Sequence, residues 1–590
     1  MLRLSTNAIR VLEARYLRRD SARRIAETPE ELFTRVATAV AEAEARFSND
    51  ADAQPKWREE FQRALTTFDF LPNSPTLMNA GLPLGQLSAC FVLAVPDTME
   101  GIFDALKHMA LIQRTGGGTG FSFSHLRPKN DFVSSTGGFS SGPVPFMKVF
   151  DCATDNIKQG GKRRGANMGV LRVDHPDVLE FIGAKLDGKT LQNFNLSVGV
   201  TDAFMEAVRD GRRFELLHPG ARVPMMELAA GELFGEIVNA AWHTGDPGLL
   251  FLDTINRTNP TPQLGDVEAT NPCGEIPLLP YEACNLGSIN LARMLRLGVP
   301  EVDWHKLAAT VRLGVRFLDD VIEINKYPLP EVEHAARASR KIGLGVMGFA
   351  ELLIRLGISY DSAQAVEFAE RLMGFIDEEA MKASQALAGE RGVFPNWERS
   401  TFAARGLKLR NATCTAIAPT GTIGIIADTT PGIEPLFALA YRRTNVLDGQ
   451  TLTEVNPLLL EHLERRGLDA KFVVKEILAS GRLQDAREVP DDLKSLFITA
   501  LDIAPDRHLQ IQAAFQRHVD NSVSKTINLP QDATEQDVEH AYLRAWELGL
   551  KGITIYRYGS KASQVLELGA GETAGPPGHS SRCDPDECRV

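Results

Sequence analysis

The segment Asn271-Pro-Cys-Gly-Glu275 holds the residues of this 590-residue chain that are best suited to chemistry. Pro272 disfavours helix and pushes Asn271 towards an extended conformation, in which residues i−2, i and i+2 point the same way. An extended segment would place the Asn271 amide, the Cys273 thiol and the Glu275 carboxylate on one face. This trio supplies a hydrogen-bond donor, a sulfur reactant and a general base. A Gly/Pro turn around a buried cysteine is the structural alternative.

Two more cysteines lie in sequence surroundings that suggest reactivity, Cys90 after Leu87-Ser-Ala and Cys284 after Tyr281-Glu-Ala. Zinc fits them poorly, because the sequence has no Cys-x-x-Cys motif and no histidine beside these cysteines. A Cys–His hydrolase has no support either, since the sequence points to no histidine partner.

The remaining cysteines form two groups. Cys152 and Cys414 lie in apolar stretches and are expected in the core. Cys583 and Cys588 follow a stretch rich in Gly, Pro and Ser, a composition typical of a flexible linker. The sequence therefore predicts a flexible arm with two cysteines, unless this is a disordered end whose cysteines are incidental.

Composition narrows the class of protein. The chain is 44% hydrophobic and 24% charged, which is ordinary globular material. Its net charge of −12 argues against nucleic acid or an anionic membrane as a partner. No stretch approaches the roughly 18 apolar residues of a membrane span, and the start has no apolar signal core. Seven cysteines, an odd number, do not fit a secreted disulfide framework, so we expect a reducing, cytoplasmic location.

The elements that must position these residues follow from periodicity. Residues 1–85 are predicted to be helical, with Leu32, Val36 and Val40 at i, i+4 and i+8. Residues 86–560 alternate strands and helices, which favours a mostly parallel α/β sheet or barrel. The clearest strand is 194–200, where Asn195 and Ser197 fall on the face opposite the apolar residues. Residues 561–590 form the tail.

Two nucleotide-binding motifs match only formally. Gly343 to Gly348 fits the dinucleotide pattern G-x-G-x-x-G, but a charged, helix-like stretch precedes it where the motif requires a strand. Gly183 to Thr190 fits the Walker A pattern, but here a helix precedes and a strand follows, the reverse of a phosphate loop. We expect neither a nicotinamide or flavin site nor an NTPase site.

Taken together, the chain resembles a class II, adenosylcobalamin-dependent ribonucleotide reductase from about Thr6 to Ser560. The strongest shared motifs are Asn271 to Glu275, Ala418-Pro-Thr-Gly-Thr422, and Lys158-Gln-Gly-Gly-Lys-Arg-Arg-Gly165. The resemblance implies a ten-stranded α/β barrel of two five-stranded parallel halves, preceded by the helical region. A central finger loop would carry Cys273 to the substrate ribose.

The resemblance also implies roles for individual residues. Cys273 matches the cysteine that becomes a thiyl radical and abstracts the 3′-hydrogen. Glu275 matches the carboxylate that takes the 3′-hydroxyl proton, and Asn271 the amide that hydrogen-bonds the ribose hydroxyls. Cys90 and Cys284 match the pair that reduces the 2′ position and ends as a disulfide, which needs Cα atoms within about 7 Å.

Further positions are implied in the same way. Cys583 and Cys588 resemble the tail dithiol that re-reduces the pair and is itself reduced by thioredoxin or glutaredoxin. The run Pro419, Thr420, Gly421 and Thr422 lies where backbone N–H groups can bind the phosphates of a ribonucleoside di- or triphosphate. Asp97, Lys158, Gln159 and Arg163 match positions that bind a deoxynucleotide effector, although a solvated basic loop is the alternative. The family's usual state is a homodimer.

The radical source separates the classes. Class I members pass a radical from a separate metal subunit through two adjacent tyrosines, but here Ile555 precedes Tyr556, and an aliphatic side chain cannot be oxidised in place of the first tyrosine. The glycyl-radical motif of class III is absent, and the single Glu-x-x-His motif, Glu331 to His334, is too little for a di-iron site. The resemblance therefore implies adenosylcobalamin, although no D-x-H-x-x-G motif marks the cobalt site and no side-chain metal ligand is identified.

Two rival functions remain from the sequence. One is a class I large subunit that needs a separate radical subunit, and the other is a non-catalytic nucleotide sensor. A sensor would need neither the cysteines nor Asn271 and Glu275. Because the chain begins at the helical lead-in, without an ATP-cone, we do not expect an overall-activity switch.

Overall fold

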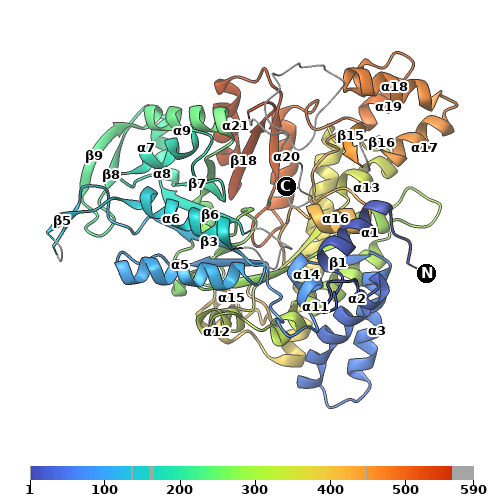
Figure 1. Ribbon diagram of the computed structural model, residues 1–590, viewed down its shortest axis with the longest axis horizontal. Coiled ribbons are helices and arrows are strands. Elements are labelled where there is room, and N and C mark those ends of the chain that lie inside the picture. Colours follow the sequence, from blue (N-terminus) through green and yellow to red (C-terminus); the bar gives the residue numbers. More distant parts are fainter. Residues whose placement is uncertain (1, 135–136, 158–164, 447–449, 561–590) are drawn as a thin grey trace.

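One ten-stranded sheet organises the chain (Figure 1). The computed structural model describes residues 2–134, 137–157, 165–446 and 450–560, and its side chains outside 441–454. The first half of the sheet is parallel throughout and consists of β2 (Cys90–Leu93), β3 (Gly118–Ser122), β6 (Asn167–Arg172), β7 (Phe194–Val200) and β10 (Gly248–Phe251). The predicted strand at 194–200 is thus confirmed as β7.

Helices cover the outer face of this half. They are α5 (Met99–Gln113), α6 (Pro143–Asn156), α7 (Val178–Ile182), α8 (Asp202–Arg209) and α9 (Ala230–Thr244). Their apolar faces share one buried cluster with the outward side chains of the strands. Burial of this kind is the main favourable contribution to folding. Figure 1 shows this half on the left, with α5 in blue and the rest in cyan and green.

The second half is also parallel. Its five strands are β13 (Ala283–Asn290), β14 (Ile342–Met347), the segment 413–418, the segment 521–525 with its direct continuation β17 (Thr526–Leu529), and β18 (Gly552–Arg557). Bridges join Leu344 to Thr415 and Ile417 to Val523, so the two segments continue the sheet between β14 and β17. Its helices are α11 (Trp304–Ile324), α12 (Pro330–Ser339), α13 (Phe349–Leu356), α14 (Ala363–Arg391), α15 (Thr401–Ala404), α16 (Gly421–Ala427), α20 (Pro505–Gln516) and α21 (Glu535–Glu547).

Two antiparallel contacts close the halves into a barrel. β2 pairs with β13 on one side, and β10 pairs with β18 on the other. The predicted ten-stranded α/β barrel of two parallel halves is therefore confirmed. One strand of the sheet lies outside it, because β1 (Phe70–Pro72) pairs with residues 287–289 of β13.

Helices precede the barrel, as the sequence predicts, namely α1 (Thr6–Val11), α2 (Pro29–Ala41), α3 (Ala53–Thr66) and α4 (Ser74–Asn79). Thr28 and Glu31 form a capping box that starts α2. Leu32, Val36 and Val40 are fully buried against the second half of the barrel. The short strand β1 in this region is not apparent from the sequence.

A buried ion network fastens the helical region to the barrel. Arg391, at the end of α14, contacts Glu44 at 2.8 Å, Asp319 at 2.8 Å and Asp320 at 2.6 Å. All four side chains are essentially inaccessible to solvent. Buried charges of this kind require partners, so each depends on the others.

Smaller elements complete the fold. Hairpins form from β4 (Phe132–Val133) with β5 (Gly138–Phe139), β8 (Arg213–Leu217) with β9 (Pro224–Ala229), and β15 (Ala440–Val446) with β16 (Gln450–Val455). The helices α17 (Pro457–Arg465), α18 (Ala470–Ser480) and α19 (Asp491–Leu496) form a group at the upper right of Figure 1. No helix among the described residues has both the length and the apolar character that a membrane crossing requires.

The two discounted motifs have structural explanations. Gly343 and Gly345 lie within β14 itself, and a Cβ on Gly345 would be 2.1 Å from the Ala416 carbonyl oxygen. These glycines therefore serve close packing of neighbouring strands. Residues 183–190 connect α7 to β7, in the predicted order of helix and then strand.

Candidate active site

Cys273 lies at the tip of a hairpin inside the barrel. Its arms are β11 (Ala269–Thr270) and β12 (Pro277–Leu278), which pair antiparallel. Between them the chain turns: the Gly274 N–H donates to the Asn271 carbonyl at 3.1 Å, and Gly274 has a φ of +82°. The Asn271 side chain accepts from the Ile276 N–H at 3.0 Å. The expected finger loop is present, but the expectation of an extended segment at 271–275 is wrong.

The turn separates the three side chains by exposure. Asn271 and Glu275 are 3% and 2% exposed, whereas Cys273 is exposed. The alternative of a buried cysteine in a turn is therefore wrong as well. The turn leaves the thiol as the accessible member of the trio, with the amide and the carboxylate buried beside it in sequence.

Both halves of the barrel hold this hairpin. The Asn195 amide of β7 donates to the Pro272 carbonyl at 2.8 Å, and the Ser522 N–H donates to the Glu275 carbonyl at 2.8 Å. The sequence does not mark Asn195 and Ser522 as functional positions. The only signal is that Asn195 lies on the polar face of its predicted strand.

Two glycines of β3 make room for the hairpin. A Cβ on Gly118 would be 2.9 Å from the Pro272 ring, and one on Gly120 would be 1.7 Å from the Thr270 carbonyl oxygen. Residues two apart on a strand face the same side, so both glycines face the barrel interior. Only glycine permits so close an approach of one backbone to another.

Cys90 and Cys284 are directly opposite each other where the two halves meet. Cys284 of β13 is the register partner of Cys90 of β2 in their antiparallel pair. Opposite residues in such a pair have Cα atoms about 4.5–5.5 Å apart, within the range that a disulfide spans. Both side chains are buried in the interior cluster that also contains Ala269, Ile276 and Leu278 of the hairpin. The structure thus brings the cysteine pair and the finger together.

Burial raises the pKa of the Cys284 thiol, which donates to the Asn285 carbonyl at 3.3 Å. At neutral pH this residue is therefore a thiol and can give up a hydrogen. Lys341 opposes the effect of burial, whereas Glu275 and Glu282 add to it.

Family comparisons agree with this arrangement. Residues 2–85 match the model of the ribonucleotide reductase all-alpha domain, and residues 88–409 and 405–556 match that of the ribonucleotide reductase barrel domain. The chain belongs to the ribonucleotide reductase family.

Two similar proteins match nearly the full length of this chain. It is 51% identical over 570 residues to a "vitamin B12-dependent ribonucleoside-diphosphate reductase" of Mycobacterium tuberculosis H37Rv, covering 96% of this chain and 80% of that protein. A protein of the same name from Thermoplasma acidophilum is 47% identical over 629 residues, covering 98% and 82%. The structure is similar to that of the Actinobacillus ureae class Id ribonucleotide reductase alpha subunit, with a TM-score of 0.76, 25% identity, and coverage of 94% and 97%.

The reductase's predicted phosphate loop lies at the end of segment 413–418. Thr420 has a left-handed φ of +52° and precedes α16. Its hydroxyl accepts from the Gly432 N–H at 2.6 Å, which holds the loop closed. Pro419, Gly421 and Thr422 remain partly exposed. The neighbouring Ala418 belongs to the interior cluster of the cysteine pair, so the loop adjoins that cluster.

The predicted effector and tail residues are only partly described. Asp97 forms an ion pair with Arg127 at 2.8 Å and also accepts from the Arg127 N–H at 3.1 Å. Lys158, Gln159 and Arg163 lie outside the described residues, as do Cys583 and Cys588 of the tail.

The two cysteines expected in the core have different outcomes. Cys414 is buried, as predicted. Cys152 is exposed, so that prediction is wrong. It lies on the solvent face of α6, whose buried side includes Met147, Phe150 and Thr154.

Two observations bear on the source of the radical, namely the position of Ile555 and the grouping of side chains that could bind a metal ion. Ile555 lies within β18 and is 1% exposed. In the part of the chain that the structure describes, no three His, Cys, Asp or Glu side chains are grouped to hold a metal ion.

Proposed function

We propose that this chain reduces ribonucleoside diphosphates to 2′-deoxyribonucleoside diphosphates as a class II, adenosylcobalamin-dependent ribonucleotide reductase. The observation that carries the proposal is the register of Cys90 with Cys284 in the same interior cluster as the finger hairpin that bears Cys273. The names of the similar proteins from Mycobacterium tuberculosis and Thermoplasma acidophilum support both the diphosphate substrate and the cofactor.

Each residue of the site has one role in this proposal. Cys273, as a thiyl radical, abstracts the 3′-hydrogen of the ribose. Glu275 accepts the 3′-hydroxyl proton, and Asn271 hydrogen-bonds the ribose hydroxyls. The pair Cys90 and Cys284 protonates the leaving 2′-hydroxyl and supplies two electrons, ending as a disulfide. The raised pKa of Cys284 suits this role, because only a protonated thiol can donate a hydrogen.

Adenosylcobalamin, when bound, supplies a 5′-deoxyadenosyl radical that can take a hydrogen atom from a thiol. The chain fits such a group in two respects. The Cys273 thiol is exposed at the tip of its hairpin, where a bound group can reach it. The position of the first relay tyrosine is the buried aliphatic Ile555, which cannot carry a radical from another subunit.

The remaining positions complete the proposal. Pro419 to Thr422 bind the substrate phosphates through backbone N–H groups. Asp97, Lys158, Gln159 and Arg163 bind a deoxynucleotide effector, and Cys583 and Cys588 pass electrons from thioredoxin or glutaredoxin to the active-site pair. The enzyme acts as a cytoplasmic homodimer.

A turnover assay tests the proposal. The full chain is incubated with adenosylcobalamin, dithiothreitol and CDP or CTP, and deoxycytidine products are measured. We expect cofactor-dependent product, more from CDP than from CTP. Cys273→Ser should abolish product while nucleotide binding persists, whereas Cys152→Ser, on the solvent face of α6, should remain active. Product that requires an added iron or manganese subunit would assign the chain to class I instead.

A further inference from the structure

A buried ion pair lies inside the barrel without a role in the reaction proposed above. The Lys341 ammonium contacts the Glu282 carboxylate at 2.6 Å, and both side chains are almost fully buried. The same Glu282 oxygen accepts from the Leu279 N–H at 2.9 Å. Burying two charges costs several kcal/mol per ion before their attraction is counted, so the position of this pair calls for an explanation.

The sheet register places the ammonium beside the cysteine pair. Ile342 is the register partner of Asn285 across β14 and β13, so Lys341, one residue earlier, lies next to Cys284. On the other side of Cys284 lies Cys90. Neighbouring strands are about 4.8 Å apart, so an ammonium and two thiols follow one another across three strands.

The inward direction of these side chains follows from alternation. Asn285 donates to the Leu318 carbonyl of α11, outside the barrel, and Ile342 packs in the apolar cluster between the second half of the barrel and the helices that cover it, which includes Leu318. Their neighbours Cys284 and Lys341 therefore face inward. Glu282, the residue just before β13 and two before Cys284, shares that face.

Charges reach Cys284 from three elements. Burial has the largest effect and raises the pKa of its thiol; Lys341 of the β14 strand end is the strongest opposing influence. Glu275 of the finger hairpin and Glu282, just before β13, both act in the same direction as burial. Of these three charges, Lys341 is the one that favours the Cys284 thiolate.

We propose that Lys341, held in place by Glu282, is a positioning residue for the redox pair Cys90 and Cys284. The Lys341 ammonium stabilises the Cys284 thiolate each time the pair is re-reduced. The inference rests on the proposed function, in which Cys90 and Cys284 form a disulfide at every turnover. The inference adds to that function a residue for the re-reduction of the Cys90–Cys284 disulfide.

The exchange balances as follows. A thiolate of an incoming dithiol attacks the Cys90 sulfur, and the electron pair of the broken S–S bond leaves with Cys284 as a thiolate beside Lys341. A proton from the second donor thiol restores the Cys284 thiol. The second donor thiolate then attacks its partner sulfur in the mixed disulfide, and Cys90 leaves and is protonated. The donor loses two electrons and two protons, and the pair gains them.

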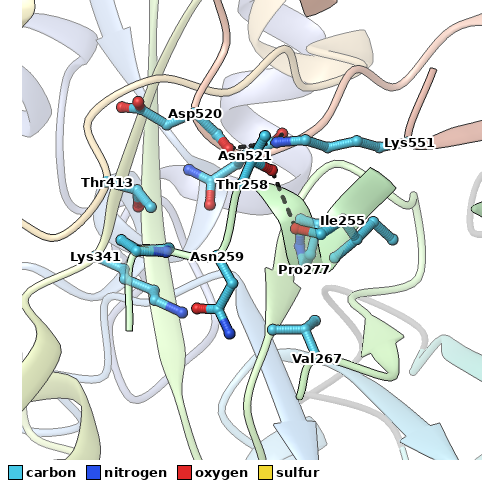
Figure 2. Close-up of a pocket in the computed structure, with 11 residues that line it drawn as sticks. Ile255, Thr258, Asn259, Val267, Pro277, Lys341, Thr413, Asp520, Asn521 and Lys551 are labelled. Atoms are coloured by element: carbon cyan, nitrogen blue, oxygen red, sulfur yellow. Dashed lines mark hydrogen bonds between the residues drawn. The ribbon is translucent and has the colours of Figure 1, made fainter. Parts of the chain in front are cut away.

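A small cavity adjoins Lys341. Lys341 lines it together with Asn259, Thr413 and Asp520, and its volume of about 20 Å³ has room for a water molecule. Figure 2 shows Lys341 and Asn259 on the same side of this cavity. A water molecule in this cavity would have polar partners and would hydrate the ammonium, which would lower the cost of burying it.

The test measures the exchange directly, without cofactor or substrate. The full chain is oxidised with diamide, dithiothreitol is added at pH 7.5, and the loss of the Cys90–Cys284 disulfide is followed by acid quench, alkylation and peptide mass spectrometry. Lys341→Met should slow the exchange about tenfold, because an adjacent cation lowers a pKa by about two units and a poorer leaving thiolate departs more slowly. Lys341→Arg, which keeps the charge, should stay within about threefold of the unaltered chain.

Two further variants separate electrostatics from folding. Lys185→Met removes a comparable lysine, which pairs with Asp246 at 2.8 Å and not with a residue beside Cys284, and should leave the rate unchanged. Lys341→Met with Glu282→Met removes both charges and leaves no unpaired carboxylate, so its rate should lie between those of Lys341→Met and the unaltered chain. Equal rates for Lys341→Met and the unaltered chain, or equal slowing in Lys185→Met, would overturn the proposal.

Turnover gives the second readout. Pre-reduced Lys341→Met should make its first equivalent of deoxynucleotide at the normal rate. Its steady-state rate should then be lower than that of the unaltered chain, because every further turnover requires re-reduction of the pair. A slow first turnover would place Lys341 in substrate chemistry and overturn the proposal. If the unaltered chain makes no deoxynucleotide, the proposed function fails, but the exchange rates still decide whether Lys341 acts on Cys284.

Discussion

Gly120→Ala should inactivate the enzyme by displacing the finger hairpin. A Cβ at this position would lie 1.7 Å from the Thr270 carbonyl oxygen, and real Cβ contacts are essentially never under 3.0 Å. The hairpin therefore has to retreat by at least 1.3 Å, the difference between these distances. A displacement of about 1 Å can cost about 100-fold in rate, so kcat should fall by about that factor or more.

The assay is steady-state product formation with saturating adenosylcobalamin, CDP and dithiothreitol, beside a thermal melt that checks folding. Overpacking should cost about 1–3 kcal/mol of unfolding free energy, which leaves the chain folded. The matched control is Gly235→Ala on α9, where the added Cβ meets nothing within 4 Å. That variant should keep full activity. If Gly120→Ala retains more than a third of the normal kcat, close approach of the two backbones does not position Cys273.

Three other predictions concern the pair, the ion network and pH. In a Cys583→Ser, Cys588→Ser variant, whose tail cannot reduce the pair, peptide mapping after one turnover without external reductant should find Cys90 linked to Cys284; a link from either to another cysteine would contradict the register argument. Arg391→Met should lower the unfolding free energy by about 3–5 kcal/mol in urea titrations, because it leaves buried carboxylates without their partner. The matched control Arg465→Met, which breaks only an exposed ion pair with Glu461, should cost under about 1 kcal/mol. Burial lowers the pKa of Lys551 from 10.5 to about 8, so the unfolded chain binds more protons between these values and stability gains with rising pH there. Lys551→Met should lose that gain in melts across the same range; an unchanged pH slope would refute it.

Much of the fold could be predicted because its signals are local. The alternation at 194–200 and the helical spacing of Leu32, Val36 and Val40 both reflect one buried face of a single element. The strand β1 gave no such signal, because its three residues become a strand only by pairing with β13, more than 200 positions later. Tertiary pairing overrides local preference in such short segments.

The site was predictable in its residue types but less so in its geometry. Pro272 and Gly274 suit either an extended segment or a turn, and the bond from the Ile276 N–H to the Asn271 side chain favours the turn. Cys152 has apolar neighbours in sequence, yet α6 presents it to solvent. Likewise, nothing local marks Lys341, whose partner Glu282 is 59 residues away.

The position of Cys90 and Cys284 at the junction of the barrel halves has a thermodynamic consequence. Their disulfide would be a covalent tie between the halves and would close a loop of about 195 residues, which on the chain-entropy argument stabilises the fold by about 5 kcal/mol. Because linkage is reciprocal, folding stabilises the disulfide relative to the dithiol by the same free energy. That lowers the reduction potential of the disulfide in the folded barrel by about 100 mV for a two-electron couple. Each catalytic cycle would then alternate between a looser reduced barrel and a tighter oxidised one, and the melting temperature would report the redox state of the enzyme.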